Sequence, residues 1–101
     1  MELSLRDRLL LTLTLPTKGK FEDLIIREDV IKKVQITQKE VAKYEVKQND
    51  KGGLTWTPNE DKFPTEFSEL EKGFIKKSLK DQSEKGELTP EFIELYKQFV
   101  E

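Results

Sequence analysis

The stretch from Phe21 to Val34 (FEDLIIREDVIKKV) constrains the fold most, because it is apolar around most of a helix's circumference. At 100° per residue, its apolar side chains cover far more than the usual stripe of a surface helix. A helix of this kind must be covered from several sides, so we expect it to be the central helix of the protein. The apolar residues are Phe21, Leu24, Ile25, Ile26, Val30, Ile31 and Val34.

The size and composition predict one folded domain spanning residues 1–101. A chain of 101 residues buries roughly 65% of its unfolded surface when it folds. Charged residues make up 38% of the chain and hydrophobic residues 35%, but the hydrophobic ones are clustered and periodic, which indicates folding rather than disorder. The net charge of −2 is too balanced to imply bulk attraction to nucleic acid or to an anionic membrane.

The residue types argue against catalysis, and we predict no catalytic, cofactor-binding or metal-binding residue. Cysteine and histidine are absent, which removes the thiolate nucleophile, the commonest general base and the commonest transition-metal ligand. Glu60 and Asp61 form an acidic pair in a loop, but no further ligand stands at a metal-binding spacing. No run approaches the ~20 apolar residues of a membrane span, and the lack of cysteine fits a reducing compartment.

Two readings are open for the first segment. Ser4 can cap a helix that runs through Leu5, Leu9 and Leu10 toward Pro16. Residues 11–15 alternate strictly and also suit a strand, so residues 9–15 are helix or strand. We favour a helix, because three consecutive leucines at 9–11 break the alternation.

The middle of the chain predicts a short helix and a β-hairpin. Thr37 and Glu40 form a capping box that opens the helix. Alternating segments at 44–48 and 54–57 then flank a loop, in which a left-handed Gly52 would place Gln48 opposite Leu54. Residues 62–67 are a candidate third strand, which its proline restricts to an edge. The sheet therefore lies within residues 44–67, with two or three antiparallel strands.

Two further helices are expected after the sheet. A capping box at Ser68 and Glu71 opens the first, which ends near Gly86, and Thr89-Pro90 opens the second. The expected buried stripes are Leu70, Phe74, Ile75 and Leu79 on the first helix, and Phe92, Tyr96 and Phe99 on the second. The predicted fold is thus α+β, with about five helices around residues 21–34 and the small sheet.

The arrangement resembles a family of small uncharacterised proteins encoded by bacteriophages and prophages. The resemblance implies a phage context and the cytoplasm of a bacterial host, and it transfers no catalytic or binding residue. The residues that carry it are Leu5-x-x-Arg8-Leu9-Leu10, Leu15-Pro16, Gly19-x-Phe21, Thr55-Trp56, Phe74-Ile75-Lys76-Lys77, Leu88-Thr89, Leu95-Tyr96 and Phe99.

By elimination, we predict a non-catalytic protein-interaction module that binds a protein of a host or virion, or a second copy of itself. On one hairpin face, Trp56 either plugs the core or forms an exposed patch with Tyr44, Val46 and Leu54. In the second case these four residues would bind the partner. An unpaired edge near Thr65 is a second route to association, by strand pairing.

The alternative function is DNA binding by a winged-helix-like protein, since three helices followed by a hairpin have that order of elements. The helix at 37–43 would enter the groove of DNA and the hairpin at 44–57 would be the wing. Residues 32–47 hold five lysines against two glutamates, whereas the whole chain is slightly acidic. The candidate DNA-binding residues are Gln38, Lys39, Lys43, Lys47 and Lys51.

Overall fold

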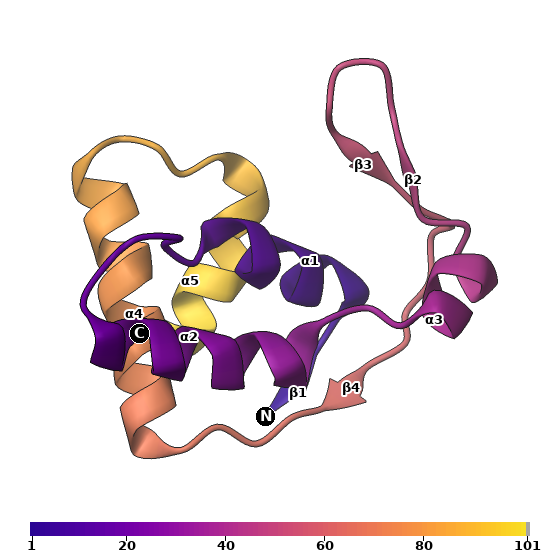
Figure 1. Cartoon of the computed structure of the whole chain (residues 1–101). Helices are drawn as coiled ribbons and strands as arrows, with labels where there is room; N and C mark the ends of the chain where they lie inside the picture. The colour runs from indigo at the N-terminus through magenta and orange to yellow at the C-terminus, as the bar shows by residue number, and fades with distance from the viewer. Residues whose placement is uncertain (101) are drawn as a thin grey trace.

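The computed structural model describes residues 1–100, and its helices and short antiparallel strands confirm the α+β prediction (Figure 1). Nearly all of the regular structure is helical, and each strand is only two residues long. In chain order the elements are β1 (Glu2–Leu3), α1 (Leu5–Thr14), α2 (Phe21–Val34), α3 (Gln38–Lys43), β2 (Lys47–Gln48), β3 (Leu54–Thr55), β4 (Phe63–Pro64), α4 (Glu69–Glu84), the 3-10 helix η1 (Pro90–Phe92) and α5 (Ile93–Val100).

The first segment is a helix as far as Thr14, so the strand reading of residues 9–15 is wrong and the preferred helix is confirmed. Ser4 caps it as expected. The Ser4 hydroxyl accepts a hydrogen bond from the Asp7 N–H, and the Asp7 carboxylate accepts one from the Ser4 N–H, both at 3.1 Å. This reciprocal pair satisfies two backbone donors that the start of a helix leaves free.

Two hydrophobic clusters lie on either side of α1. The larger, which we call the body cluster, joins α1 to α2, α4 and α5 and contains Leu3, Leu10, Leu11, Leu15, Val30, Val34, Phe67, Ile75, Leu79 and Leu95. The smaller, which we call the lobe cluster, is built on Leu5, Leu9 and Tyr44, with Ile36, Val46, Leu54, Trp56 and Phe63 packed against it. Because α1 contributes leucines to both clusters, it is the most enclosed helix of the protein.

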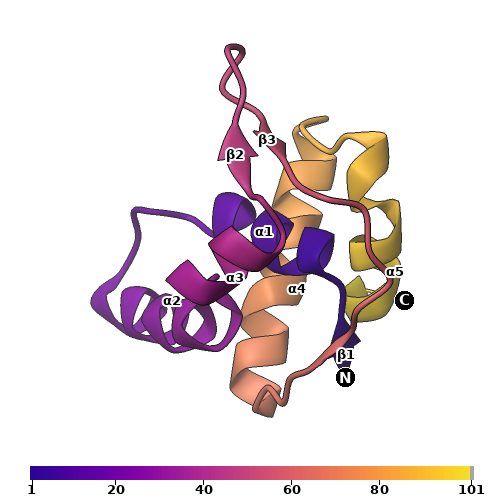
Figure 2. The ribbon, with the colours of Figure 1, turned by 90° about the vertical axis from the view of Figure 1, so that its right-hand side faces the viewer.

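The expectation that α2 is covered from several sides is wrong. Helix α2 packs against both α1 and α4, and Val30 and Val34 are fully buried there. However, Phe21 is 73% exposed and Ile25 lies on the same exposed face. Figure 2 shows the reason, since α2 lies at one side of the molecule with neighbours on its inner face only. Helical periodicity identified the helix but overstated how much of its surface is covered.

The hairpin forms with the predicted register. Gln48 pairs with Leu54 and Lys47 with Thr55, and Gly52 has a φ of +82°, which is the left-handed conformation that the loop requires. The third strand does not join this sheet. Instead, β4 pairs with β1 at the other end of the chain. The Thr65 N–H donates to the Met1 carbonyl at 2.7 Å, so Thr65 already has a strand partner.

The capping box at Ser68 and Glu71 and the left-handed Gly86 are confirmed for α4. Ile75 and Leu79 are buried as predicted and Phe74 partly so, but Leu70 is 67% exposed. The reason is that Glu71, rather than Leu70, turns toward α2 in the first turn of α4, where its carboxylate binds Lys33 at 2.5 Å.

On α5 the fully buried residue is Leu95, and the predicted Phe92, Tyr96 and Phe99 flank it, half-buried. The face of the last helix that packs on the protein is therefore centred on Leu95, one residue before Tyr96 of the predicted aromatic stripe.

Candidate protein-binding groove

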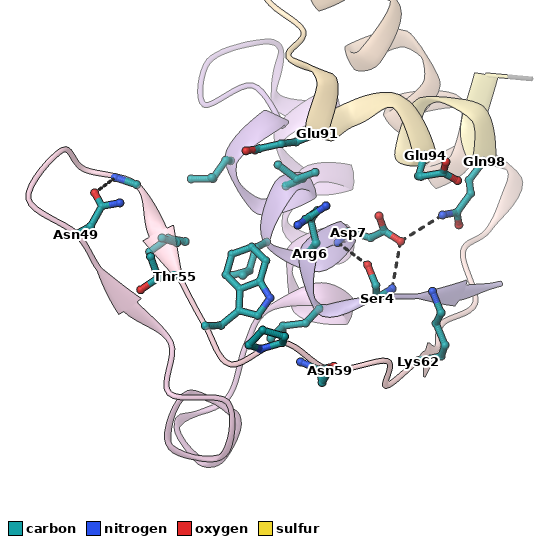
Figure 3. Close-up of a pocket in the computed structure, with 18 residues that line it drawn as sticks. Ser4, Arg6, Asp7, Asn49, Thr55, Asn59, Lys62, Glu91, Glu94 and Gln98 are labelled. Atoms are coloured by element: carbon teal, nitrogen blue, oxygen red, sulfur yellow. Dashed lines mark hydrogen bonds between the residues drawn. The ribbon is translucent and has the colours of Figure 1, made fainter.

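An open groove of about 850 Å³ separates the hairpin from the helices (Figure 3). Its floor is one face of α1, one wall is β3 with the chain that follows it, and the other wall is η1 and α5. This volume lies within the ~300–1,000 Å³ of typical ligand pockets, although the groove is much more open. It is therefore a candidate site for a segment of another chain rather than for an enclosed small molecule.

The floor of the groove is apolar because the start of α1 fixes which of its side chains face the groove, and three of these are leucines. The Ser4 cap sets the helical register, which brings Leu5, Leu9 and Leu13 to one face at a spacing of four residues. Leu5 and Leu9 are buried under the hairpin, whereas Leu13 is 69% exposed in the part of the groove that the hairpin leaves open. Leu13 therefore extends the buried row of leucines into the open part of the groove.

The four predicted partner-binding residues come together in the lobe cluster, but only Leu54 and Trp56 line the groove. Both are partly exposed, so Trp56 both packs on the core and faces the groove. Val46 is also half-buried, on the lobe cluster and away from the groove lining. Of the four residues predicted to form one patch, a partner in the groove would therefore contact only these two.

Tyr44 is the third buried member of the lobe cluster, being 5% exposed, and it cannot contact a partner directly. Its hydroxyl donates a hydrogen bond to the Asp61 carboxylate at 2.5 Å. This bond, together with burial, raises the pKa of the Tyr44 hydroxyl above its ordinary value. Tyr44 therefore ties the base of the hairpin to the loop before β4.

Charged side chains line the groove above its apolar floor (Figure 3). The Arg6 guanidinium lies 5.9 Å from the centre of the Trp56 ring, at cation–π distance. Glu91 and Glu94 project from η1 and α5, on the wall opposite the hairpin. Within residues 1–100, neither these carboxylates nor Arg6 forms an ion pair.

Arg8, which sequence reasoning did not single out as a site, holds the hairpin region to the helices. It is buried, and its guanidinium donates to the carbonyls of Val34 (3.1 Å) and Gln35 (2.7 Å) at the end of α2. It also donates to both carboxylate oxygens of Glu40, at 2.5 and 3.1 Å, and lies 4.4 Å from the Phe63 ring centre. The hydrogen bond from Arg8 is the main reason that the pKa of Glu40 falls to about 2.

The candidate DNA-binding residues lie on adjacent exposed elements. Gln38, Lys39 and Lys43 belong to α3, Lys47 to β2, and Lys51 to the tip of the hairpin. The helix is six residues long and none of its residues is buried. Lys43 also has a contact of its own, because its ammonium lies 3.8 Å from the Asp61 carboxylate.

Acidic side chains do not converge into a metal-binding group in the described part of the chain. Within residues 1–100, no three carboxylates lie close enough together to hold a metal ion. Of the acidic pair singled out in the sequence, Asp61 accepts a hydrogen bond from Tyr44 and lies near Lys43. No helix among these residues is long and apolar enough to cross a membrane.

Comparisons with known proteins do not place the chain in a family. No protein-family model matches the sequence, and neither a curated protein nor a solved structure matches the chain.

Proposed function

We propose that this protein is a non-catalytic interaction module that binds a segment of a partner protein in the groove between the hairpin and α1. The observation that carries the proposal is the apolar strip of Leu13, Leu54 and Trp56, which is left partly uncovered between charged walls. An apolar centre with a polar rim is the usual anatomy of a protein interface.

Trp56 is the expected anchor of this interface. Large aromatic residues in partly covered pockets supply much of the binding energy at interfaces, since they offer a wide apolar surface with few rotatable bonds. Arg6 beside the ring and Glu91 and Glu94 opposite it would then select among partners by charge.

The test is a pull-down with tagged protein from bacterial lysate, treated with nuclease and read by mass spectrometry. Leu13→Lys places a charge on the groove floor, and because Leu13 is exposed, the variant should fold normally. Leu70→Lys is the matched control, since Leu70 is equally exposed but lies outside the groove. A partner retained by the wild type and by Leu70→Lys, but lost from Leu13→Lys, supports the proposal.

Trp56→Ala provides an independent check on the anchor, provided that circular dichroism shows it to be folded. Capture that is unchanged in both Leu13→Lys and folded Trp56→Ala would overturn the proposal. If Trp56→Ala unfolds, Leu13→Lys alone decides the outcome.

DNA binding is the second candidate function, favoured by the exposure of all five candidate residues on α3 and the hairpin. Reversing the charges of Lys39, Lys43 and Lys47 together should abolish retention of a mixed-sequence duplex in a gel-shift experiment. Reversal of three lysines on α4, Lys72, Lys76 and Lys80, is the control. Equal retention of the duplex by both triple variants would dispose of this function.

A bacteriophage context and a location in the bacterial cytoplasm remain predictions drawn from the family resemblance. A host or virion protein among the captured partners would support them.

A further inference from the structure

The outer edge of β3 carries backbone groups that are free to pair. The Asn49 N–H donates to the Gly53 carbonyl at 2.8 Å, so these two residues form a hydrogen-bonded pair. Such pairs alternate with non-bonded pairs in an antiparallel ladder, which makes Gln48 and Leu54 a non-bonded pair. The backbone groups of Leu54, and of Trp56 two residues later, therefore point away from β2. Neither residue makes a backbone hydrogen bond to another element within residues 1–100.

This free edge faces the groove. In Figure 1, β3 lies on the side of the hairpin nearer α1 and α5, and in Figure 2 it lies on the side nearer α5. The groove lining agrees, because it includes the continuous stretch 53–56 of β3 and its flanks but neither residue of β2. A chain in the groove would thus meet unpaired amide and carbonyl groups on one side.

The opposite wall sets the charge of such a chain. Glu91 points toward the hairpin across the groove, and Glu94 lies farther along the same wall beside Gln98 (Figure 3). Neither carboxylate has an ion-pair partner within residues 1–100. The basic residues of the groove lining are Arg6, which lies over the Trp56 ring, and Lys62, and neither lies on the wall of η1 and α5. Two adjacent unpaired carboxylates favour a segment that carries lysine or arginine on this side.

Resting on the proposed function, we propose that the groove takes an extended segment of a partner protein, which adds to β3 as a third strand. The segment alternates aliphatic side chains, which pack on Leu13, Leu54 and Trp56, and it carries a basic residue against Glu91 and Glu94. In strand addition, main-chain hydrogen bonds provide affinity and alternate side chains provide specificity. The volume of the groove suits one strand rather than a folded domain.

The test selects binders from a displayed library of short random peptides, using the intact protein. Peptides that bind the wild type but not Leu13→Lys are kept as groove binders. We expect them to alternate apolar residues and to contain lysine or arginine. Glu91→Lys with Glu94→Lys should weaken binding of the leading synthetic peptide about tenfold. Glu84→Lys with Glu87→Lys, which has the same spacing outside the groove, should leave it unchanged.

Amide methylation of that peptide tests the strand geometry. A strand has two edges and only one can pair with β3, so methylating alternate amides on the pairing edge should weaken binding at least tenfold. Methylating the other alternate set should have little effect. A helical or irregular ligand would not show this difference between the two sets.

The outcomes separate the two proposals. An absence of peptides sensitive to Leu13→Lys would overturn the proposed function and this inference with it. Groove binders that respond equally to both methylation sets and ignore the charge reversal would overturn strand addition alone. A dimer of the free protein that dissociates in Leu13→Lys would show that a second copy fills the groove, which also overturns the inference.

Discussion

The body cluster and the lobe cluster are held together by different kinds of contact. The body cluster buries ten apolar residues, which come from four helices, from β1, and from the segments just after α1 and just before α4. The lobe cluster buries only Leu5, Leu9 and Tyr44, and two of these belong to α1. The hairpin region relies instead on polar ties, which are the Arg8–Glu40 ion pair and the hydrogen bond from Tyr44 to Asp61.

The two clusters should therefore differ in local stability. Burial of apolar surface stabilises by about 25 cal/mol per Å², so a region with few buried residues gains little from its own packing. We therefore expect the hairpin to open at a lower free energy than the helices. The candidate groove lies at this boundary, with one wall on each region, so a bound strand would stabilise the less stable side.

The largest expected effect comes from deleting a side chain of the body cluster. Leu79→Ala leaves a cavity at a fully buried position between the helices and should lower the free energy of unfolding by about 3 kcal/mol. Leu70→Ala, on the same helix but mostly exposed, should change it by less than about 0.5 kcal/mol. Urea unfolding followed by circular dichroism measures both. Similar losses in the two variants would contradict the assigned body cluster.

The next largest effect comes from removing the tie between the two regions. Arg8→Met removes the donor of two carbonyls and the charged partner of Glu40, whose carboxylate keeps its hydrogen bonds from Thr37. The loss should cost about 3 kcal/mol or somewhat less, because Glu40 is partly exposed. Hydrogen exchange should show the loss of protection concentrated in α3 and the hairpin. Arg6→Met, an exposed arginine on the same helix, is the control. Uniform loss across all helices would mean that the hairpin is not a separate unit.

Acid should weaken the same tie. The pKa of Glu40 is about 2 in the folded protein, against an ordinary value of 4.5, so the unfolded chain binds the proton more readily. The Glu40 carboxylate contributes its full stabilisation above about pH 5. This stabilisation is lost as the pH falls toward 2, and the loss is about 2 kcal/mol at pH 3.

Glu71 should add to the loss of stability in acid. Its burial favours the neutral form, but hydrogen bonds from Lys33 and the Ser68 backbone outweigh this and lower its pKa. Urea unfolding at pH 7 and pH 3 measures the total. Arg8→Met should lose most of the pH dependence that comes from Glu40, because the hydrogen bonds from Thr37 account for a smaller part of the lowered pKa, and it should keep the part that comes from Glu71. An unchanged pH dependence in Arg8→Met would show that Arg8 is not the cause.

The smallest expected effect is a gain at the junction of α3 and the hairpin. Glu45 has a φ of +52°, and the Val46 N–H donates to the Val41 carbonyl at 3.0 Å, as in a Schellman cap. Glycine adopts this conformation without the steric cost of a side chain. Glu45→Gly should therefore raise the free energy of unfolding by about 0.5 kcal/mol.

Glu45→Ala separates the backbone effect from the loss of the side chain. Both variants remove the exposed hydrogen bond from Thr57 to the Glu45 carboxylate, but alanine keeps the Cβ atom. Thermal unfolding of the two variants side by side gives the comparison. A gain in Glu45→Ala equal to that in Glu45→Gly would show that the carboxylate, rather than the backbone, is unfavourable.

The local structure of this protein could be predicted from its residue types. The caps at Ser4, Thr37 and Ser68, the left-handed Gly52 with its hairpin register, and the end of α4 at Gly86 all formed where they were predicted. Each depends on hydrogen bonds or backbone angles among residues close in the chain, so the residue types suffice to specify it.

Which faces are covered and which distant segments meet depends on how the helices pack, and the sequence patterns did not predict it. The pairing of β1 with β4, the binding of Arg8 to Glu40, and the exposure of Phe21 and Leu70 all depend on how the helices pack. Helical periodicity shows that a face is apolar but not whether a neighbour reaches it. The groove also depends on tertiary packing, because its walls come from segments far apart in the chain. Local sequence patterns do not predict how far apart such segments lie in the folded protein.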